Sequence, residues 1–197
     1  MRDFIYRGNI SHDLCDKIIE YHKNSKEKNP GLIIGTSEQG ISSRYVDKKI
    51  KDSIDIMLDS NADLYLEYTN QLQKNINTYI EIFPSCNYYS PCGVNEPINI
   101  QYYPPGGGYK VWHTERGTAK GVCSTRHLVF MTYLNDVTDG GGTQFLNQNL
   151  TVDAKKGLTL MWPADWTYTH KGVVSPSQEK YIVTGWLNYL ELENANV

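Results

Sequence analysis

Residues 128–134 read Leu-Val-Phe-Met-Thr-Tyr-Leu, a nearly uninterrupted apolar run. A short run of this kind predicts a strand that is buried on both faces. Upstream, residues 98–102 alternate between apolar and polar side chains, which is typical of a half-buried strand. Downstream, short candidate strands separated by Gly, Asn and Asp turns lie at 143–146, 150–152, 158–162 and 181–189. Many short strands at this density favour a sandwich or barrel, and a double-sheet jelly roll is the most economical choice.

The N-terminal part of the chain follows a helical period instead. Ser11 and Asp13 precede apolar residues at helical spacing, so a helix is predicted to begin there and to end in a Lys-rich stretch. Residues 63–83 carry apolar side chains every three or four positions, which predicts a long amphipathic helix. Residues 31–45 are rich in Gly and Ser and are interpreted as a mobile loop. Residues 54–58 are compatible with a short strand or a helix.

The length of 197 residues suits one domain with a sizeable core. The expected fold class is mainly β with N-terminal helices (α+β). Residues 1–90 are expected to form a helical N-terminal support, and residues 91–197 a jelly-roll core, a double-stranded β-helix, that packs against those helices.

Composition excludes several classes of protein. The net charge is −3 and the sequence has no basic stripe, so a nucleic-acid partner is not expected. No apolar run approaches the roughly 20 residues that span a bilayer, and the N-terminus has no signal-peptide core. A cytoplasmic location is therefore predicted, with no membrane partner, and a bacterial or a viral source would fit equally. The oligomeric state is left open.

The four cysteines are scattered without the spacing of a metal or redox motif. Such cysteines in a domain of this size are more often reduced thiols than disulfides. A Cys86–Cys92 disulfide is the less favoured alternative. The cysteines are Cys15, Cys86, Cys92 and Cys123.

His113-Thr114-Glu115 places two candidate metal ligands two residues apart, on the same side of the chain if this segment is extended. His170 is a third candidate ligand, and Lys180 follows it. Two histidines and one carboxylate match the facial triad of non-haem Fe(II) oxygenases, which leaves coordination positions open. A cation shortly after the last ligand suggests a co-substrate that carries a carboxylate.

Each histidine also has a simpler interpretation. The tripeptide His-x-Glu alone is weak evidence, because an isolated pair of this kind is more often a surface ion pair. His12 and His22 lie in the predicted first helix and are interpreted as surface or boundary residues. His127, beside Arg126 at the start of the apolar strand, is assigned a packing role in preference to metal binding.

The order of short motifs along the chain gives the triad its specificity. These motifs are Tyr103–Tyr109, His113–Glu115, Tyr133–Asp136, Gly141–Phe145, Lys156-Gly157, His170–Val173 and Lys180–Trp186. The series resembles the 2-oxoglutarate- and Fe(II)-dependent dioxygenase superfamily and, within it, the prolyl 4-hydroxylase-like branch. The resemblance covers roughly residues 98–190. The family usually carries Asp where this chain has Glu115, whose side chain is longer by one methylene, about 1.5 Å of reach.

The resemblance implies a set of roles. His113, Glu115 and His170 would hold Fe(II), and 2-oxoglutarate and O2 would take the open positions. Lys180 would pair with the distal carboxylate of 2-oxoglutarate. The hydroxyl groups of Tyr103, Thr143 and Tyr133 would add hydrogen bonds to this co-substrate, with core packing as the alternative for Tyr133. Ascorbate would be compatible as an accessory reductant.

Two further interpretations concern the surroundings of this site. Trp186, on the final strand near the expected entrance, is assigned either to substrate contact or to the core. The glycines Gly140–Gly142 are expected to allow a positive-φ turn into the strand of Thr143.

The expected function is hydroxylation of prolyl or similar residues in a peptide or protein, with release of succinate and CO2. The first alternative is the same oxidation of a free amino acid or another small metabolite. Two minor alternatives are a non-catalytic jelly-roll module that binds metal and a metal-dependent hydrolase. The hydrolase leaves Lys180, Tyr103 and Thr143 unexplained, and no cysteine has the spacing of a structural zinc site.

Overall fold

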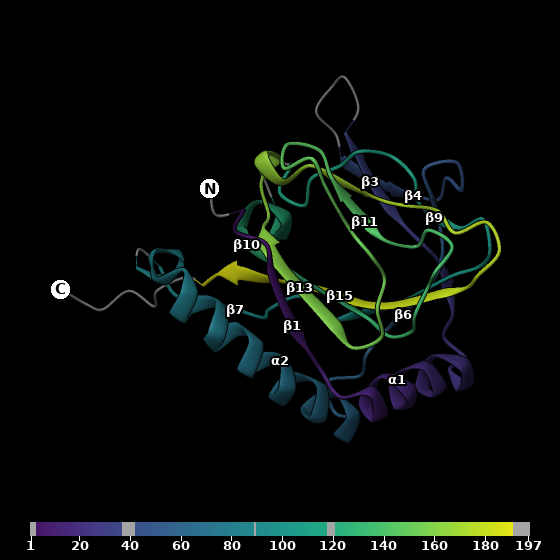
Figure 1. Cartoon of the computed structure of the whole chain (residues 1–197), viewed down its shortest axis with the longest axis horizontal. Coiled ribbons are helices and arrows are strands. Elements are labelled where there is room, and N and C mark those ends of the chain that lie inside the picture. The colour runs from purple at the N-terminus through teal and green to yellow at the C-terminus, as the bar shows by residue number, and fades with distance from the viewer. Residues whose placement is uncertain (1–2, 37–41, 89, 118–120, 191–197) are drawn as a thin grey trace.

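The computed structural model describes residues 3–36, 42–88, 90–117 and 121–190. Its largest sheet is antiparallel, with the strand order β1-β13-β10-β15-β8-β6-β2, and β7 pairs with β15 (Figure 1). The strands of this main sheet are β1 (Tyr6–Asn9), β2 (Asn29–Pro30), β6 (Ile54–Met57), β7 (Cys92–Gly93), β8 (Asn99–Tyr103), β10 (Arg126–Tyr133), β13 (Leu158–Pro163) and β15 (Lys180–Tyr189).

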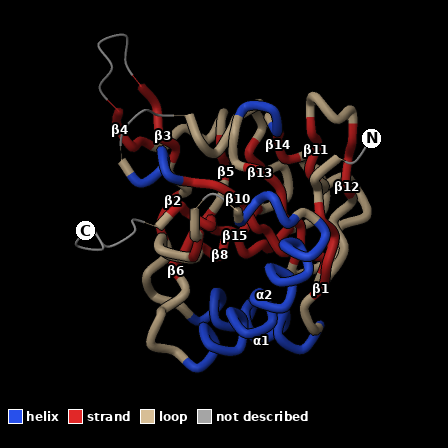
Figure 2. The backbone as a smooth tube through the Cα atoms, turned by 90° about the vertical axis from the view of Figure 1, so that its left-hand side faces the viewer, coloured by secondary structure: helices blue, strands red, loops and turns tan. Residues whose placement is uncertain are grey.

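A second antiparallel sheet lies against one face of the main sheet. Its strands are β11 (Thr143–Phe145), β12 (Leu150–Val152) and β14 (His170–Gly172), in the order β12-β11-β14. Two shorter ribbons border it: β3 (Ile33–Thr36) pairs with β4 (Ser42–Tyr45), and β5 (Lys51–Asp52) pairs with β9 (Gly108–Tyr109). The ribbon of β3 and β4 projects from the body of the molecule on the side away from the helices (Figure 2).

Helices α1 (His12–Asn24) and α2 (Asp63–Ile82) cover the other face of the main sheet (Figures 1 and 2). The side chain of Ser11 caps α1, because its hydroxyl oxygen accepts a hydrogen bond from the amide of Leu14 at 3.3 Å. Within the described residues, three short 3-10 helices lie in the connections: η1 (Pro84–Asn87), η2 (Val122–Thr125) and η3 (Trp166–Tyr168).

Alternation along β10 divides the interior into two cores. The side chains of Leu128 and Phe130 join the core between the main sheet and the helices. Those of Val129, Met131 and Tyr133 join a second core between the two sheets. Because successive side chains of a strand point to opposite faces, both faces of β10 must be apolar, which explains its nearly continuous apolar sequence.

The described residues confirm most of the predicted elements. Both predicted helices are present as α1 and α2, and the strands of the C-terminal half fall within a few residues of their predicted bounds. Residues 54–57 form a strand, β6, which settles the choice left open there. The N-terminal third also contributes β1, β2 and β6 to the main sheet, in addition to its helices.

Two sequence expectations were wrong. The segment 31–45, predicted as a mobile loop, contains β3 and β4, whose pairing runs from Ile33 opposite Tyr45 to Thr36 opposite Ser42; residues 37–41 lie outside the described part. Mutual backbone pairing, which a Gly/Ser-rich sequence does not reveal, explains these strands. His22, interpreted as a surface or boundary residue, is 2% exposed because β6 packs beside it; its Nε2 lies 3.0 Å from the carbonyl oxygen of Ile54.

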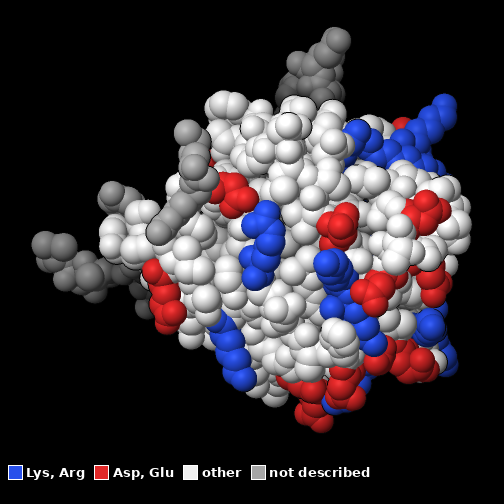
Figure 3. All heavy atoms as spheres, in the orientation of Figure 1, with Lys and Arg blue, Asp and Glu red and all other residues white. Residues whose placement is uncertain are grey.

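All four cysteines are free thiols, as preferred from their spacing. On the face shown in Figure 3, acidic and basic side chains are interspersed and form no continuous basic stripe. Among the described residues, neither helix is both long and apolar enough to cross a membrane.

Candidate metal centre and co-substrate cavity

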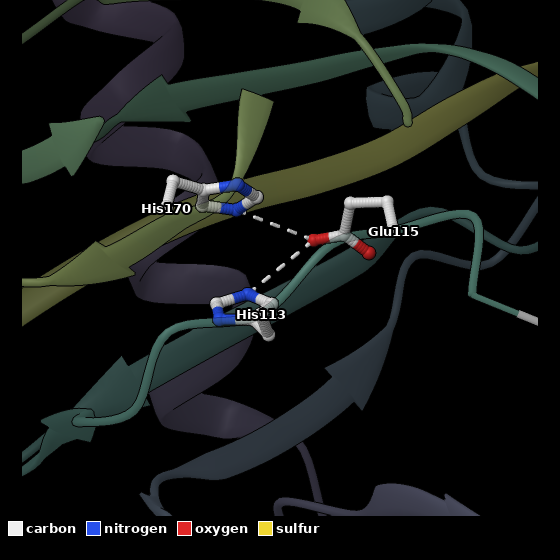
Figure 4. A group of neighbouring side chains, drawn as sticks. All are labelled: His113, Glu115 and His170. Carbon is white, nitrogen blue, oxygen red and sulfur yellow. Dashed lines mark ion pairs between the residues drawn. The ribbon is translucent and has the colours of Figure 1, made fainter. Parts of the chain in front are cut away.

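The side chains of His113, Glu115 and His170 converge on one point between the two sheets (Figure 4). The Oε1 atom of Glu115 lies 3.6 Å from Nε2 of His113 and 3.5 Å from Nε2 of His170. One donor atom of each residue lies within 4.8 Å of the other two. The sequence-predicted ligand set is therefore brought together, and these atoms are close enough to share one metal ion.

Backbone hydrogen bonds hold this set together. His113 and His170 form an isolated antiparallel bridge, in which their amides and carbonyls bond at 3.0 and 2.9 Å. The amide of Glu115 donates to the carbonyl of Ala164 at 3.2 Å. His170 begins β14, whereas His113 and Glu115 lie outside the named strands, in an irregular segment that follows β9. Their convergence thus depends on the bridge and the contact with Ala164, in addition to the alternation expected for a strand.

The histidines are oriented through their other ring nitrogens. Nδ1 of His113 lies 3.0 Å from the carbonyl oxygen of Val111, and Nδ1 of His170 lies 2.9 Å from that of Tyr168. A carbonyl can only accept, so each Nδ1 carries the proton and each Nε2 keeps a lone pair. The ring of Tyr109 stacks on His113 at a centroid distance of 3.6 Å. Both imidazoles are therefore fixed in the tautomer that binds a metal through Nε2.

The electrostatics of the three side chains suit a divalent cation. Burial and the neighbouring His170 lower the pKa of His113, which keeps its imidazole neutral. Burial opposes ionisation of Glu115, but its contacts with His113 and His170 outweigh this effect and hold the pKa of Glu115 well below its usual range. Two imidazole nitrogens and one carboxylate oxygen fit Fe(II), which favours mixed nitrogen and oxygen ligands.

A cavity of about 290 Å³ extends from this centre between the sheets. Lys180 lines it, and its side chain is only 6% exposed. Its ammonium donates a hydrogen bond to the carbonyl of Gly141 at 2.9 Å and lies 4.8 Å from the ring centroid of Tyr103. Burial lowers the pKa of Lys180 to about 8. Lys180 thus places a poorly solvated cation in the cavity, where an anionic group would stabilise it.

The turn before β11 presents Gly141 to this lysine. Gly140 and Gly141 both have positive φ, at 82° and 75°, which confirms the conformation expected for these two glycines. A Cβ on Gly140 would lie 2.4 Å from the carbonyl oxygen of Val174. The conformation and the close packing both favour glycine here.

The three predicted hydroxyl residues lie in or beside the cavity, each with a protein partner. The hydroxyl of Tyr103 donates to Oε1 of Gln101 at 2.7 Å. The hydroxyls of Tyr133 and Thr143 are 2.6 Å apart. Tyr103 and Thr143 line the cavity, whereas Tyr133 is completely buried and reaches it through Thr143.

Trp186 also lines the cavity, and its indole N–H donates to Oε2 of Glu115 at 3.1 Å. Trp186 was predicted to contact substrate or to belong to the core, and the structure adds a contact that neither prediction included, a hydrogen bond to a candidate metal ligand. His127 lies apart from the centre: its Nε2 is 2.7 Å from the carbonyl oxygen of Cys86 and its ring stacks on Tyr189. The packing role expected for His127 agrees with these contacts.

Sequence reasoning missed two charged pairs of this site. Arg126 contacts Glu115 and forms an ion pair with Glu96 at 2.7 Å. Lys51, 5% exposed, lines the cavity and pairs with Asp55 at 2.6 Å. The sequence position of Arg126 could have predicted its ion pair, because an arginine at the start of a buried apolar strand needs an anionic partner. Nothing in the sequence around Lys51 predicted its place in the cavity, since it lies in a short polar segment.

Comparison with known proteins agrees with this geometry. The model of the 2OG-Fe(II) oxygenase superfamily matches residues 98–188. No curated protein sequence matches the chain.

Several solved structures share the fold. A viral collagen prolyl hydroxylase from Paramecium Bursaria Chlorella virus-1 superposes with a TM-score of 0.67 at 16% identity, over 96% of this chain and 97% of that one. A Pseudomonas putida prolyl-4-hydroxylase gives 0.68 at 17% identity, over 95% and 93%. A Trichoplax adhaerens prolyl hydroxylase, solved with a hypoxia inducible factor peptide fragment, gives 0.65 at 16%, over 95% and 84%.

Residues 98–188, a little under half of the chain, carry the sequence pattern of the 2OG-Fe(II) oxygenase superfamily. Its fold, mostly antiparallel β sheets with two α-helices in the described part, is similar to that of prolyl 4-hydroxylases. The protein is a 2-oxoglutarate-dependent dioxygenase, with Fe(II), 2-oxoglutarate and O2 as its cofactor and co-substrates. The family match and the His-Glu-His geometry together argue against the non-catalytic and hydrolase alternatives.

Proposed function

We propose that this dioxygenase hydroxylates prolyl or similar residues of a peptide or protein, with release of succinate and CO2. The fold supports this assignment, because the similar structures include a viral collagen prolyl hydroxylase and a prolyl hydroxylase in complex with a peptide fragment. At 16% identity the likeness concerns the fold, so the choice of substrate must come from the chain's own residues.

Exposed apolar side chains beside the site carry the proposal. Leu32 lines the cavity and is 48% exposed. Val111 and Trp112, directly before His113, are each 39% exposed, and the ammonium of Lys171 lies 4.5 Å from the Trp112 ring centroid. Large apolar side chains at the edge of a site are typical of surfaces that bind another chain, and tryptophan is prominent among residues that dominate such binding. An extended peptide could contact them while one residue enters the cavity.

The residues of the centre have separate tasks in this proposal. His113, Glu115 and His170 would hold Fe(II), through the nitrogens and the oxygen that already face one another. When bound, the iron with 2-oxoglutarate and O2 supplies the oxidising power that breaks an unactivated C–H bond. The neighbouring side chains orient the reactants and keep the cavity shielded from water.

Lys180 pairs with the distal carboxylate of 2-oxoglutarate. Among the described residues its ammonium donates to one acceptor, Gly141, so other N–H donors remain for a ligand. Thr143 and Tyr103 add hydroxyl groups beside this anion, and Tyr133 fixes the hydroxyl of Thr143. A charge-assisted hydrogen bond in a buried site is stronger than a neutral one, which makes Lys180 the main anchor.

We further propose that the two sheets form a double-stranded β-helix and that residues 1–197 form one domain. In this view residues 91–197 are the catalytic core and residues 1–90 support it. The second core, shared by strands of both sheets, supports a closed β architecture around the cavity.

The alternative substrate is a free amino acid or another small metabolite. One observation favours it: Lys51, which is buried and pairs with Asp55, also lines the cavity and adds a second ammonium there beside that of Lys180. A carboxylate of a small metabolite could be recognised by such a cation.

The test begins with anaerobic titration of the protein with Fe(II) and 2-oxoglutarate. A weak visible charge-transfer band and slow succinate release in air are expected, and His113→Ala should abolish both. A screen of peptides and metabolites for the mass gain of one oxygen atom then identifies the substrate. Oxidation of metabolites alone, with every peptide unmodified, would overturn the peptide proposal.

The substitution Trp112→Ala tests whether the substrate is a peptide or a small metabolite. Loss of this side chain should raise the KM for a peptide substrate about tenfold, since interface tryptophans commonly contribute more than about 1 kcal/mol. Leu66→Ala is the matched control, because Leu66 is also exposed but lies on α2, on the far side of the main sheet. Equal peptide KM values for the two variants would contradict the role given to the apolar residues beside the site.

A further inference from the structure

The two oxygens of the Glu115 carboxylate have different surroundings. Oε1 faces Nε2 of His113 and of His170. Oε2 accepts hydrogen bonds from the indole N–H of Trp186 at 3.1 Å and from the guanidinium of Arg126 at 3.4 Å. Arg126 also donates to the main-chain carbonyl of Glu115 at 3.1 Å. One oxygen is thus directed to the metal position, and the other is held by the protein.

Arg126 is itself immobilised. Its guanidinium makes two hydrogen bonds to the carboxylate of Glu96, at 2.8 and 2.7 Å, and lies 3.4 Å from the ring centroid of Trp186. The side chain of Asn188 donates to Glu96 at 3.0 Å. The side chains of Arg126 and Glu96 are 9% and 8% exposed. A planar guanidinium bound on two edges and stacked on one face has little freedom left.

A β-bulge brings Arg126 to this position. Along β10, the side chains of Val129 and Met131 face the second core, so strict alternation would turn Arg126 toward the helices. The register between β10 and β15 shifts between Arg126 and Leu128, which places Arg126 opposite Asn188. One extra residue in a strand turns the side chains of the residues that precede it to the opposite face of the sheet. The bulge therefore directs Arg126 into the cavity.

We propose that Arg126 and Trp186 are positioning residues for Glu115, and that they allow this chain to use Glu where related enzymes usually use Asp. The inference rests on the proposed metal ligation by Glu115. The extra methylene of Glu adds a rotatable bond, so a free Glu side chain would lose more conformational freedom on binding a metal. Holding Oε2 removes that freedom in advance and leaves Oε1 as a single-oxygen ligand.

A purely structural role would be different. If Arg126 and Trp186 only completed the packing beneath the site, their loss would lower stability without a specific effect on metal binding. The two roles can be distinguished by comparing the loss of metal affinity when position 115 carries Glu with the loss when it carries the shorter Asp.

The test is a double-substitution cycle read by Co(II), a redox-stable probe for an Fe(II) site. Trp186→Phe removes the N–H donor and keeps most of the ring. We expect it to weaken Co(II) binding by about 10- to 100-fold, the usual cost of losing a partner that orients a ligand. Trp166→Phe is the matched control, because Trp166 is 70% exposed and lies in η3, outside the set of residues that line the cavity; its Co(II) affinity should equal that of the wild type.

The second arm repeats Trp186→Phe in a Glu115→Asp background. The shorter carboxylate cannot reach both the metal position and the indole, so here the loss of the N–H should change Co(II) affinity by less than about threefold. The visible spectrum of bound Co(II) should change on Trp186→Phe in the wild-type background and stay the same in the Glu115→Asp background. Thermal unfolding of each metal-free variant verifies that the fold is retained.

Two results would overturn the proposal. One is unchanged Co(II) affinity in Trp186→Phe; the other is an equal loss in the wild-type and Glu115→Asp backgrounds, which indicates a structural role. Failure of the metal assignment itself has its own signature, since His113→Ala would then bind Co(II) as tightly as the wild type, and the positioning role would fall with it.

Discussion

The substitution Lys180→Met should separate co-substrate binding from folding. Methionine matches the length of the lysine stem and removes only the charge. Two unit charges about 4 Å apart attract by about 4 kcal/mol at an effective dielectric constant of about 20. Part of this offsets desolvation, and measured hydrogen bonds to charged groups contribute about 1.5–3 kcal/mol net. At about 1.4 kcal/mol per tenfold, 2-oxoglutarate should bind about 10- to 150-fold more weakly.

The fold should not suffer from this change. The Lys180 side chain is almost fully buried and desolvation lowers its pKa to about 8, so in the free protein its ammonium is a poorly stabilised cation. Its replacement by an apolar side chain should leave the free energy of unfolding unchanged or raise it.

The assay is anaerobic titration of the Fe(II) form with 2-oxoglutarate, followed by the charge-transfer band. The matched control ligand is 2-oxobutyrate, which has the keto acid but no distal carboxylate and should bind the wild type and Lys180→Met equally. Equal affinity of both proteins for 2-oxoglutarate would refute the assignment of Lys180. A parallel loss of affinity for both ligands would place the defect at the metal and not at the distal carboxylate.

Three further outcomes are expected. Because burial lowers the pKa of Lys180 to about 8, its ammonium is present below that pH and lost above it, so 2-oxoglutarate affinity should fall as pH rises through about 8; a flat titration from about pH 7 to about 9.5 would contradict this. Tyr133→Phe should weaken 2-oxoglutarate binding about two- to tenfold, which is the contribution of one neutral hydrogen bond. If Tyr133 acts through Thr143, the same substitution should cause no further loss of affinity in a Thr143→Val background. Additive losses of affinity in calorimetry would show that Tyr133 contacts the co-substrate directly. Gly185→Ala would place a Cβ 2.3 Å from the ring of buried Phe130 and should cost about 1–3 kcal/mol in urea unfolding, whereas an unshifted midpoint would show that the ring can move.

The helices and most strands could be predicted from the sequence because their burial pattern is periodic. In α2, the buried residues Tyr68, Leu72, Ile76 and Tyr79 recur every three or four positions. β10 is apolar throughout because it separates two cores. By contrast, β3 and β4 gave no apolar alternation, since their pairing rests on backbone hydrogen bonds that side chains do not report.

The ligand set could be predicted because its chemistry is local: His113 and Glu115 are two residues apart, and His170 is marked by its neighbours in the motif series. The charged residues around the ligand set could not be predicted from the sequence. Arg126 reaches the cavity only through a bulge, a register shift that depends on the pairing of β10 with β15. Lys51 reaches it through the pairing of β5 with β9. Both are consequences of tertiary pairing, which the sequence of either strand alone does not specify.

Strand β15 fixes the distance between two side chains of the centre. Lys180 and Trp186 lie six residues apart on one face of the same strand, a span of about 20 Å. One end is thus set to the proposed co-substrate anchor and the other to Glu115. Because β15 is clamped between β8 and β10, a slip by one residue would turn both side chains out of the cavity together. The spacing between iron and anion is therefore a property of sheet register, and a register error would abolish both functions in a single step.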